Sequence, residues 1–157
     1  MGGVNFIYTI PSISLLGFLI PVSGIGDKTA IITLILYGLL PMIRNTYEGI
    51  IGVDKGIVQV AEAMGSTNFQ ILYKIKLPLA AGIIIAGFKN MVVMTIALTG
   101  IASFIGAGGL GIAVYRGITT NNSLLTIGGS LLIAVLAITL DWGIGIIEKK
   151  IKRRLDL

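Results

Sequence analysis

The feature that most constrains this chain is a set of long apolar stretches without charged side chains. Residues 1–26 contain no aspartate, glutamate, lysine or arginine, and similar stretches recur further along the chain. A helix needs about 20 consecutive apolar residues to cross a membrane. Hydrophobic residues make up 55% of the 157 residues and charged residues only 12%, which is more apolar surface than a soluble domain of this length can hide. The sequence therefore predicts an all-α integral membrane protein.

We expect one transmembrane domain with about four spans. The predicted spans are residues 4–22, 29–46, 78–99 and 124–147. Pro11 and Pro21 interrupt the first span, and the backbone groups that they free require neighbouring helices or water, so we expect this helix to pack inside a bundle. Pro78 is expected to open the third span, because proline fits the first turn of a helix.

The basic residues predict the orientation of the chain. Nine of the 12 lysines and arginines flank or occupy the loop at 47–77 or the tail at 148–157. Basic residues favour the cytoplasmic side of a membrane. We therefore expect both the loop and the tail to be cytoplasmic, with an even number of spans between them. The placement of these charges explains the net charge of +5 without nucleic-acid binding.

The amino-acid composition excludes several kinds of catalytic and metal site. The chain has no cysteine and no histidine, which excludes disulfides, iron–sulfur clusters and thiolate metal sites, and removes the commonest general base. No nucleophile–base pair or cluster of metal ligands is visible. We expect no catalytic residue, no cofactor and no metal site, and hence no enzyme activity in this chain.

The loop between the second and third spans carries the most informative pattern. Residues 53–64 and 68–75 are expected to form two short amphipathic helices, broken at Gly65-Ser66-Thr67. Glycine allows a sharp change of direction at low steric cost, with a positive φ that other residues avoid. The spaced residues of this pattern are Gln59, Val60, Ala61, Gly65, Ile75, Leu77 and Pro78.

This spacing resembles the EAA loop of permease subunits in ATP-binding-cassette importers. That loop has Glu-Ala-Ala, three residues, Gly, nine residues, Ile, one residue and Leu-Pro. Gln59 and Val60 depart from the usual residues, whereas the spacing matches throughout. The resemblance implies that the loop couples the spans to an ATP-binding subunit. The alternative is an ordinary interfacial amphipathic helix.

Three further segments resemble the permeases of osmoprotectant importers, which carry glycine betaine, carnitine, choline and related quaternary ammonium compounds. They are residues 9–12, residues 37–46 and the glycine-rich residues 101–111. The resemblance implies a MetI-like transmembrane fold, a second identical or related permease subunit, two ATP-binding subunits and an extracytoplasmic substrate-binding protein. Such permeases usually have at least one further span before residues 9–12, so we expect that this chain lacks an N-terminal span.

Two features inside the predicted bundle are candidates for the translocation path or a subunit interface. One is Lys89, because a charge in the middle of a span is costly and usually faces a partner or an aqueous cavity. Snorkelling, or pairing with Asp141, is the alternative. The other is a set of glycines: Gly106, Gly108, Gly109 and Gly111. These also fit the dinucleotide-binding fingerprint, but they follow a predicted span rather than a strand.

The main functional prediction is therefore a permease subunit that imports an osmoprotectant, with ATP hydrolysed by a partner subunit. One alternative is the same fold carrying an amino acid or another small solute. A second is a small channel or structural membrane subunit that uses no ATP.

Overall fold

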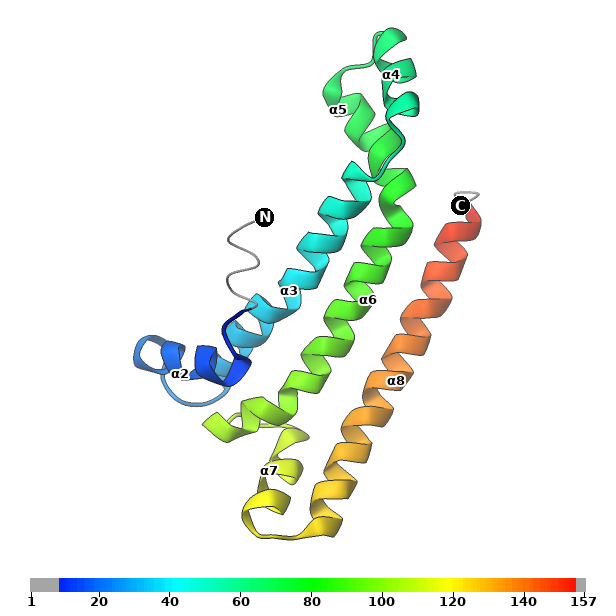
Figure 1. Cartoon of the computed structure of the whole chain (residues 1–157). Coiled ribbons are helices and arrows are strands. Elements are labelled where there is room, and N and C mark those ends of the chain that lie inside the picture. The colour runs from blue at the N-terminus through cyan, green and yellow to red at the C-terminus, as the bar shows by residue number, and fades with distance from the viewer. Residues whose placement is uncertain (1–8, 155–157) are drawn as a thin grey trace. The chain divides into compact units, whose positions relative to one another are not determined.

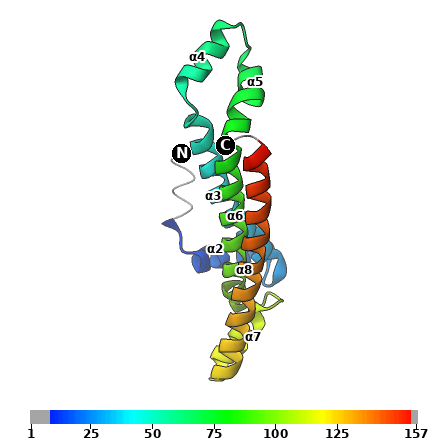
Figure 2. The ribbon, with the colours of Figure 1, turned by 90° about the vertical axis from the view of Figure 1, so that its right-hand side faces the viewer.

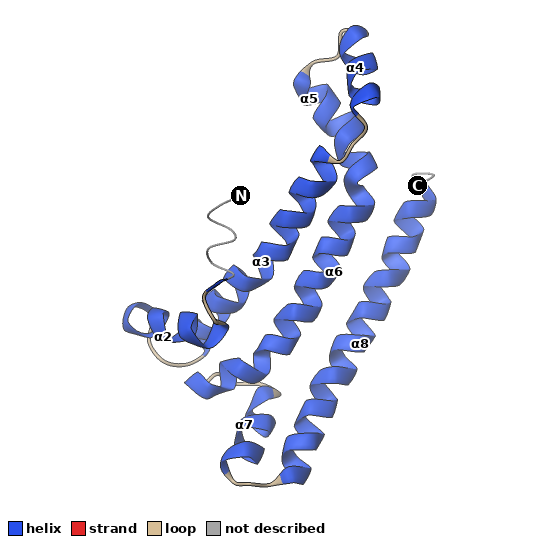
Figure 3. Cartoon of the chain, in the orientation of Figure 1, coloured by secondary structure: helices blue, strands red, loops and turns tan. Residues whose placement is uncertain are grey.

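The computed structural model describes residues 9–154, and every regular element in that range is a helix (Figures 1 and 3). This confirms the predicted all-α class. The chain divides into two compact units. Unit 1 comprises Met1–Leu40 and Met91–Trp142, and unit 2 comprises Pro41–Asn90 and Gly143–Leu157.

The first described helix is shorter than predicted. Helix α2 runs over Ser12–Ser23, has 12 residues and follows Pro11. At about 1.5 Å per residue it is too short for the roughly 30 Å hydrocarbon core of a bilayer. Residues 4–8 of the predicted first span lie outside the described residues. The physical reason for the break is Pro11, which cannot donate a backbone hydrogen bond and disfavours helical geometry at Ile10.

Three helical stretches of the described chain are long and apolar enough to cross a membrane: Asp27–Ile51, Asn68–Ile105 and Ser123–Ile151. They correspond to the second, third and fourth predicted spans and extend beyond each of them. The sequence predicted about four spans, so the described residues supply one fewer.

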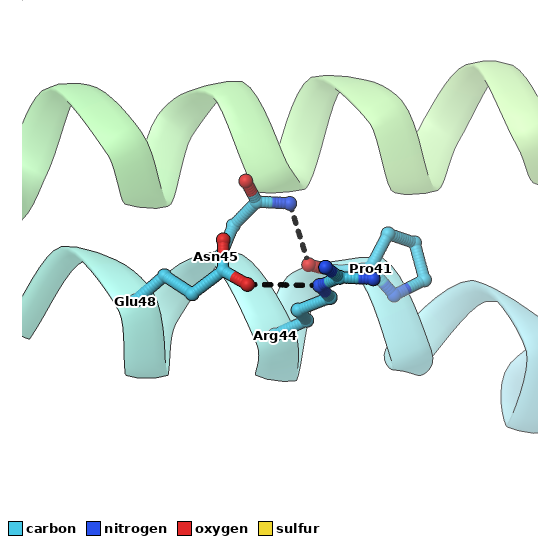
Figure 4. Close-up of polar contacts among 4 residues, drawn as sticks. All are labelled: Pro41, Arg44, Asn45 and Glu48. Carbon is cyan, nitrogen blue, oxygen red and sulfur yellow. Dashed lines mark hydrogen bonds and ion pairs between the residues drawn. The ribbon is translucent and has the colours of Figure 1, made fainter. Parts of the chain in front are cut away.

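Helix α3, Asp27–Ile51, continues through Pro41. Asp27 lies in its first turn, where a negative charge suits the helix dipole. One turn after Pro41, the Asn45 side chain donates to the Pro41 carbonyl at 2.8 Å, and the exposed Arg44 pairs with Glu48 at 2.9 Å (Figure 4). Arg44 and Glu48 are both well exposed, so this pair contributes little to stability.

Unit 1 is packed through glycines at which side chains would collide. It holds α2, the first part of α3, the end of α6 (Leu77–Ala102), the 3₁₀ turn η2 (Ser103–Ile105), α7 (Gly111–Thr119) and most of α8 (Ser123–Arg154). A Cβ atom at Gly38 of α3 would lie 2.7 Å from the Thr95 hydroxyl of α6. A Cβ atom at Gly117 of α7 would lie 2.3 Å from the Thr126 hydroxyl of α8. Small residues of this kind let membrane helices approach closely.

Unit 2 contains the predicted loop. Its elements are the end of α3, α4 (Lys55–Ala63), α5 (Asn68–Ile71), the π turn η1 (Leu72–Lys76), the first part of α6 and the end of α8. Figure 2 shows α4 and α5 beyond the ends of α3 and α6 that they connect. Helices α3 and α6 again meet at glycines: a Cβ atom at Gly87 would lie 2.7 Å from the Cβ atom of Asn45.

Helix α8 exposes its apolar side chains. Only 6% of its most apolar stretch is buried, and Leu131, Val135 and Ile138 are all more than half exposed. A monomeric soluble protein rarely exposes so large an apolar surface. This surface suits lipid.

Candidate functional site

The first helix of the loop, α4, is fixed at its start by Asp54. Its carboxylate accepts the backbone N–H groups of Gly56 at 2.6 Å and Ile57 at 3.2 Å. Such a cap satisfies donors that the first turn of a helix leaves unpaired. Of the three residues aligned with Glu-Ala-Ala, Ala61 is buried at 6% exposure, whereas Gln59 and Val60 are exposed.

The chain reverses at Gly65, as the sequence predicted. Its φ is +82°, and no atom lies within 4 Å of the position that a Cβ atom would take. The N–H of Gly65 donates to the Glu62 carbonyl at 2.9 Å, and the N–H of Ser66 donates to the Ala61 carbonyl at 3.1 Å. This pair of bonds is a Schellman motif, which ends a helix with a glycine in the left-handed region.

The second helix of the loop starts with a capping box. The Thr67 hydroxyl accepts the Gln70 N–H at 3.3 Å, and the Gln70 side chain accepts the Thr67 N–H at 2.8 Å. Ile71 is buried, and the Phe69 and Tyr73 rings stack with centroids 4.8 Å apart. The loop is therefore a folded pair of short helices that are tied at both sides of Gly65.

The loop leaves several large apolar side chains exposed. Met64 is 82% exposed, Phe69 69% and Val60 61%. Large exposed apolar side chains of this kind can bind a partner protein or the membrane surface. The loop can thus offer apolar anchors to a partner, on a backbone that is already ordered.

Pro78 lies in the first turn of α6, which begins at Leu77, but no break separates α6 from the helix before it. The second helix of the loop does not end at Ile75 but runs without a break from Asn68 to Ile105. Ile75 lies in the π turn η1, and Leu77 and Pro78 open α6 immediately after it. Wider helical geometry just before the proline allows the chain to pass Pro78 without a break.

The glycine-rich segment lies in unit 1 and is bound to the start of α3. The Asp27 carboxylate accepts the backbone N–H of Gly108 at 2.6 Å, although the two residues are 81 positions apart. Gly106 and Gly109 have φ values of +77° and +90°. A Cβ atom at Gly111 would lie 2.4 Å from the Thr99 carbonyl oxygen, so α7 can leave the end of α6 only with glycine there.

Lys89 is half-buried on α6 and belongs to unit 2 together with the loop. Its ammonium nitrogen lies 3.8 Å from the position of a Cβ atom at Gly145 of α8. The Lys89 side chain therefore lies against a glycine of α8. Its pairing with Asp141 stays a prediction.

The site residues thus form two groups. The loop residues and Lys89 are in unit 2, whereas the four glycines are in unit 1. Sequence reasoning missed Asp27, for which no local signal exists because its partner is so distant in the chain. It also missed the π turn, although Pro78 beside a predicted helix was a usable signal. In residues 9–154, no group of three potential metal ligands is present.

Comparison with known proteins places these features in a family. Residues 1–153 match the family described as binding-protein-dependent transport system inner membrane component. The carnitine transport permease protein OpuCB of Listeria monocytogenes is 37% identical over 151 residues, which are 96% of this chain and 69% of that permease. The glycine betaine/carnitine/choline transport system permease protein OpuCD of Bacillus subtilis is 42% identical over 146 residues, which are 92% of this chain and 64% of OpuCD.

A solved structure has the same fold. It is an inward-facing form of the MetNI methionine ABC transporter, with a TM-score of 0.87 and 24% identity over 96% of this chain and 73% of the matched chain. This likeness confirms the predicted MetI-like fold. With a family match over nearly the whole length, the resemblance of the motifs to permeases is also confirmed, and the chain belongs to the binding-protein-dependent transport system inner membrane components.

Proposed function

We propose that this chain is the membrane-spanning permease subunit of an ATP-binding-cassette importer for a quaternary ammonium osmoprotectant such as glycine betaine, carnitine or choline. The family and the transport named in its relatives support this cargo class. ATP would be hydrolysed by a partner subunit. The chain spans 64 to 69% of the length of the two permeases compared above.

The observation that carries the proposal is the structure of the loop at 47–77. Two capped helices meet at Gly65, and the second is continuous with α6 over Asn68–Ile105. A partner that pushes or pulls the loop therefore acts on a stiff helix rather than on a flexible linker. The exposed Met64 and Phe69 side chains are suitable anchors for an ATP-binding subunit. Burial of such side chains contributes about 1.5–3 kcal/mol each.

We also assign partners and a translocation path. The partners are two ATP-binding subunits, a second permease subunit, an extracytoplasmic substrate-binding protein and the lipid bilayer. Lys89 and the four glycines Gly106, Gly108, Gly109 and Gly111 would line the path or the permease interface. Direct contact between Lys89 and a cationic cargo is disfavoured, because like charges repel. Lys89 would instead respond to the transport cycle through α6 and α8.

The experiment co-expresses the chain with the ATP-binding and binding-protein genes of its own locus in cells that lack osmoprotectant uptake. Uptake of labelled glycine betaine, carnitine, choline and methionine is measured, and the ATP-binding subunit is sought after purification through a tag on the chain. Osmoprotectant uptake that requires the ATP-binding subunit is expected. Uptake of methionine and of no osmoprotectant would show that the cargo is an amino acid instead. Uptake without any ATP-binding subunit would indicate a channel.

A matched pair of substitutions tests the loop within the same assay. Met64 and Leu124 are 82% and 85% exposed, but Met64 lies at the end of α4 and Leu124 at the start of α8. Met64→Ala is expected to weaken recovery of the ATP-binding subunit by about tenfold, whereas Leu124→Ala leaves it unchanged. Equal recovery with both variants would show that the loop is not the docking surface.

A further inference from the structure

A π-helical turn lies inside the helix that joins the loop to the predicted span. The turn η1 covers Leu72–Lys76, and the backbone N–H of Leu77 donates to the carbonyl of Leu72, five residues earlier. Hydrogen bonds in an α-helix reach back only four residues, so a π turn holds one extra residue. Helix α5 precedes the turn and α6 follows it. Single π turns are rare and occur frequently at functional sites.

Pro78 supplies a physical cause for this turn. In an α-helix, the ring of a proline collides with the carbonyl four residues earlier, which here belongs to Lys74. The π turn ends at Lys76, so the wider geometry includes Lys74 itself. Moving that carbonyl outward relieves the collision and lets the helix pass through the proline. Prolines and π turns are both known causes of helix distortion.

The extra residue controls the direction in which α5 faces. Each residue of an α-helix turns the chain by about 100°. One residue added to a regular α-helix would therefore rotate the preceding segment, here α5, by about 100° relative to α6. The wider π turn accommodates the added residue without this rotation. With the turn in place, Ile71 is buried at 3% exposure and Phe69, two residues earlier, is 69% exposed.

We propose that Pro78 and the π turn Leu72–Lys76 together set the rotation of α5 relative to α6, so that Phe69 faces outward and Ile71 inward. Pro78 is then a positioning residue. The docking role of this rotation, which would point the loop toward an ATP-binding subunit, rests on the proposed function. The rotation itself is a property of this chain alone.

A substitution and a compensating deletion test the idea. Pro78→Ala removes the collision, so α-helical hydrogen bonding can run through residues 72–76 and α5 rotates by about 100°. Deleting Lys74 from the Pro78→Ala chain removes the extra residue. An uninterrupted α-helix then returns α5 to its original rotation.

Thiol labelling of the detergent-solubilised chain reads the rotation. The natural chain has no cysteine, so Phe69→Cys and Ile71→Cys can each be introduced alone. With Pro78 present, the cysteine at 69 is expected to react about tenfold or more faster than that at 71. Pro78→Ala should abolish this difference, and the added Lys74 deletion should restore it. Pro21→Ala, in α2, is the matched proline control and should leave the difference intact.

Two results would overturn the positioning role. If Pro78→Ala kept the full labelling difference, proline would not hold the turn. If the deletion failed to restore the difference, including where Pro78→Ala merely unfolded the loop, the extra residue would not be the cause. Labelling needs no partner, so it stands apart from the proposed function. Recovery of the ATP-binding subunit should follow the labelling, falling with Pro78→Ala and returning with the deletion. If recovery of the ATP-binding subunit did not change with the rotation, only the docking role would be overturned.

Discussion

At the scale of single residues, glycines illustrate what the sequence can and cannot predict. Glycine is required at position 65 because the backbone φ there is +82°. This requirement was predictable, because Gly65 lies between two amphipathic segments. Gly117 needs its small size because a Cβ atom would lie 2.5 Å from the Thr126 backbone nitrogen. That requirement comes from the packing of α7 on α8, and no local sequence pattern indicates it. The bond from Gly108 to Asp27 was unpredictable for the same reason.

The first residue-scale prediction concerns the reversal at Gly65. Alanine there would cost about 1–2 kcal/mol of backbone strain, and valine more, because β-branched residues avoid positive φ. If docking requires the reversal, recovery of the ATP-binding subunit and osmoprotectant uptake should fall by roughly 5- to 30-fold. The order of activity expected in the uptake assay is glycine, alanine, valine.

Asparagine provides the control for Gly65. It tolerates the left-handed region better than other residues with a side chain, and the space around Gly65 is open. Gly65→Asn should therefore retain most of the uptake, although asparagine is larger than alanine. Loss of activity in order of side-chain size, with asparagine below alanine, would attribute the role of Gly65 to space rather than to φ.

The second residue-scale prediction concerns Lys89. Lys89→Ala should insert at least as well as the natural chain, because a central charge costs up to about 2.5–3.5 kcal/mol on insertion scales. We expect fewer molecules of osmoprotectant imported per ATP hydrolysed, with Lys89→Arg retaining more of the coupling. Unchanged uptake and ATPase rates in Lys89→Ala would leave the side chain with a packing role against Gly145.

At the scale of elements, the two loop helices and the three long spans could be read from the sequence, because their periodicity and their lack of charge are local properties. The two departures from the expected boundaries both involve proline. Pro11 lies directly before the start of α2, inside the predicted first span, whereas no break separates α6, with Pro78 in its first turn, from the helix before it. Proline marks an irregularity, but the surrounding packing decides whether the helix stops or widens.

Adjacent glycines in α8 allow a matched test of helix packing. A Cβ atom at Gly129 would lie 2.9 Å from the Ala113 Cβ atom and 3.0 Å from the Val114 backbone nitrogen, whereas Gly128 has nothing within 4 Å. Gly129→Ala should destabilise the α7–α8 pair by about 1–3 kcal/mol through overpacking. Gly128→Ala should be neutral or stabilise by up to about 1 kcal/mol. The check is the temperature at which each variant loses its monodisperse peak in detergent, and equal temperatures would contradict this packing.

At the scale of the whole molecule, the basic residues and the long apolar helices predict one topology. The loop and the tail are separated by two long apolar stretches, Asn68–Ile105 and Ser123–Ile151. Two crossings return the chain to the side on which it started, whether or not α2 enters the membrane. The bond between Asp27 and Gly108 joins the start of α3 to the segment after α6.

Cysteine labelling in intact cells tests this topology, since the natural chain has no background thiol. Glu62 in the loop, Lys150 in the tail and Lys28 at the start of α3 are all exposed positions for single cysteines. A membrane-impermeant reagent should label Lys28→Cys in intact cells and the other two only after permeabilisation, because basic loops are retained in the cytoplasm. Labelling of all three in detergent checks that each thiol can react.

Two outcomes would contradict the topology. If Lys28→Cys and Lys150→Cys were both labelled from outside while Glu62→Cys stayed protected, α8 would not cross the membrane. If Glu62→Cys and Lys150→Cys were both labelled and Lys28→Cys protected, the whole chain would be inverted, and its loop could not reach a cytoplasmic ATP-binding subunit.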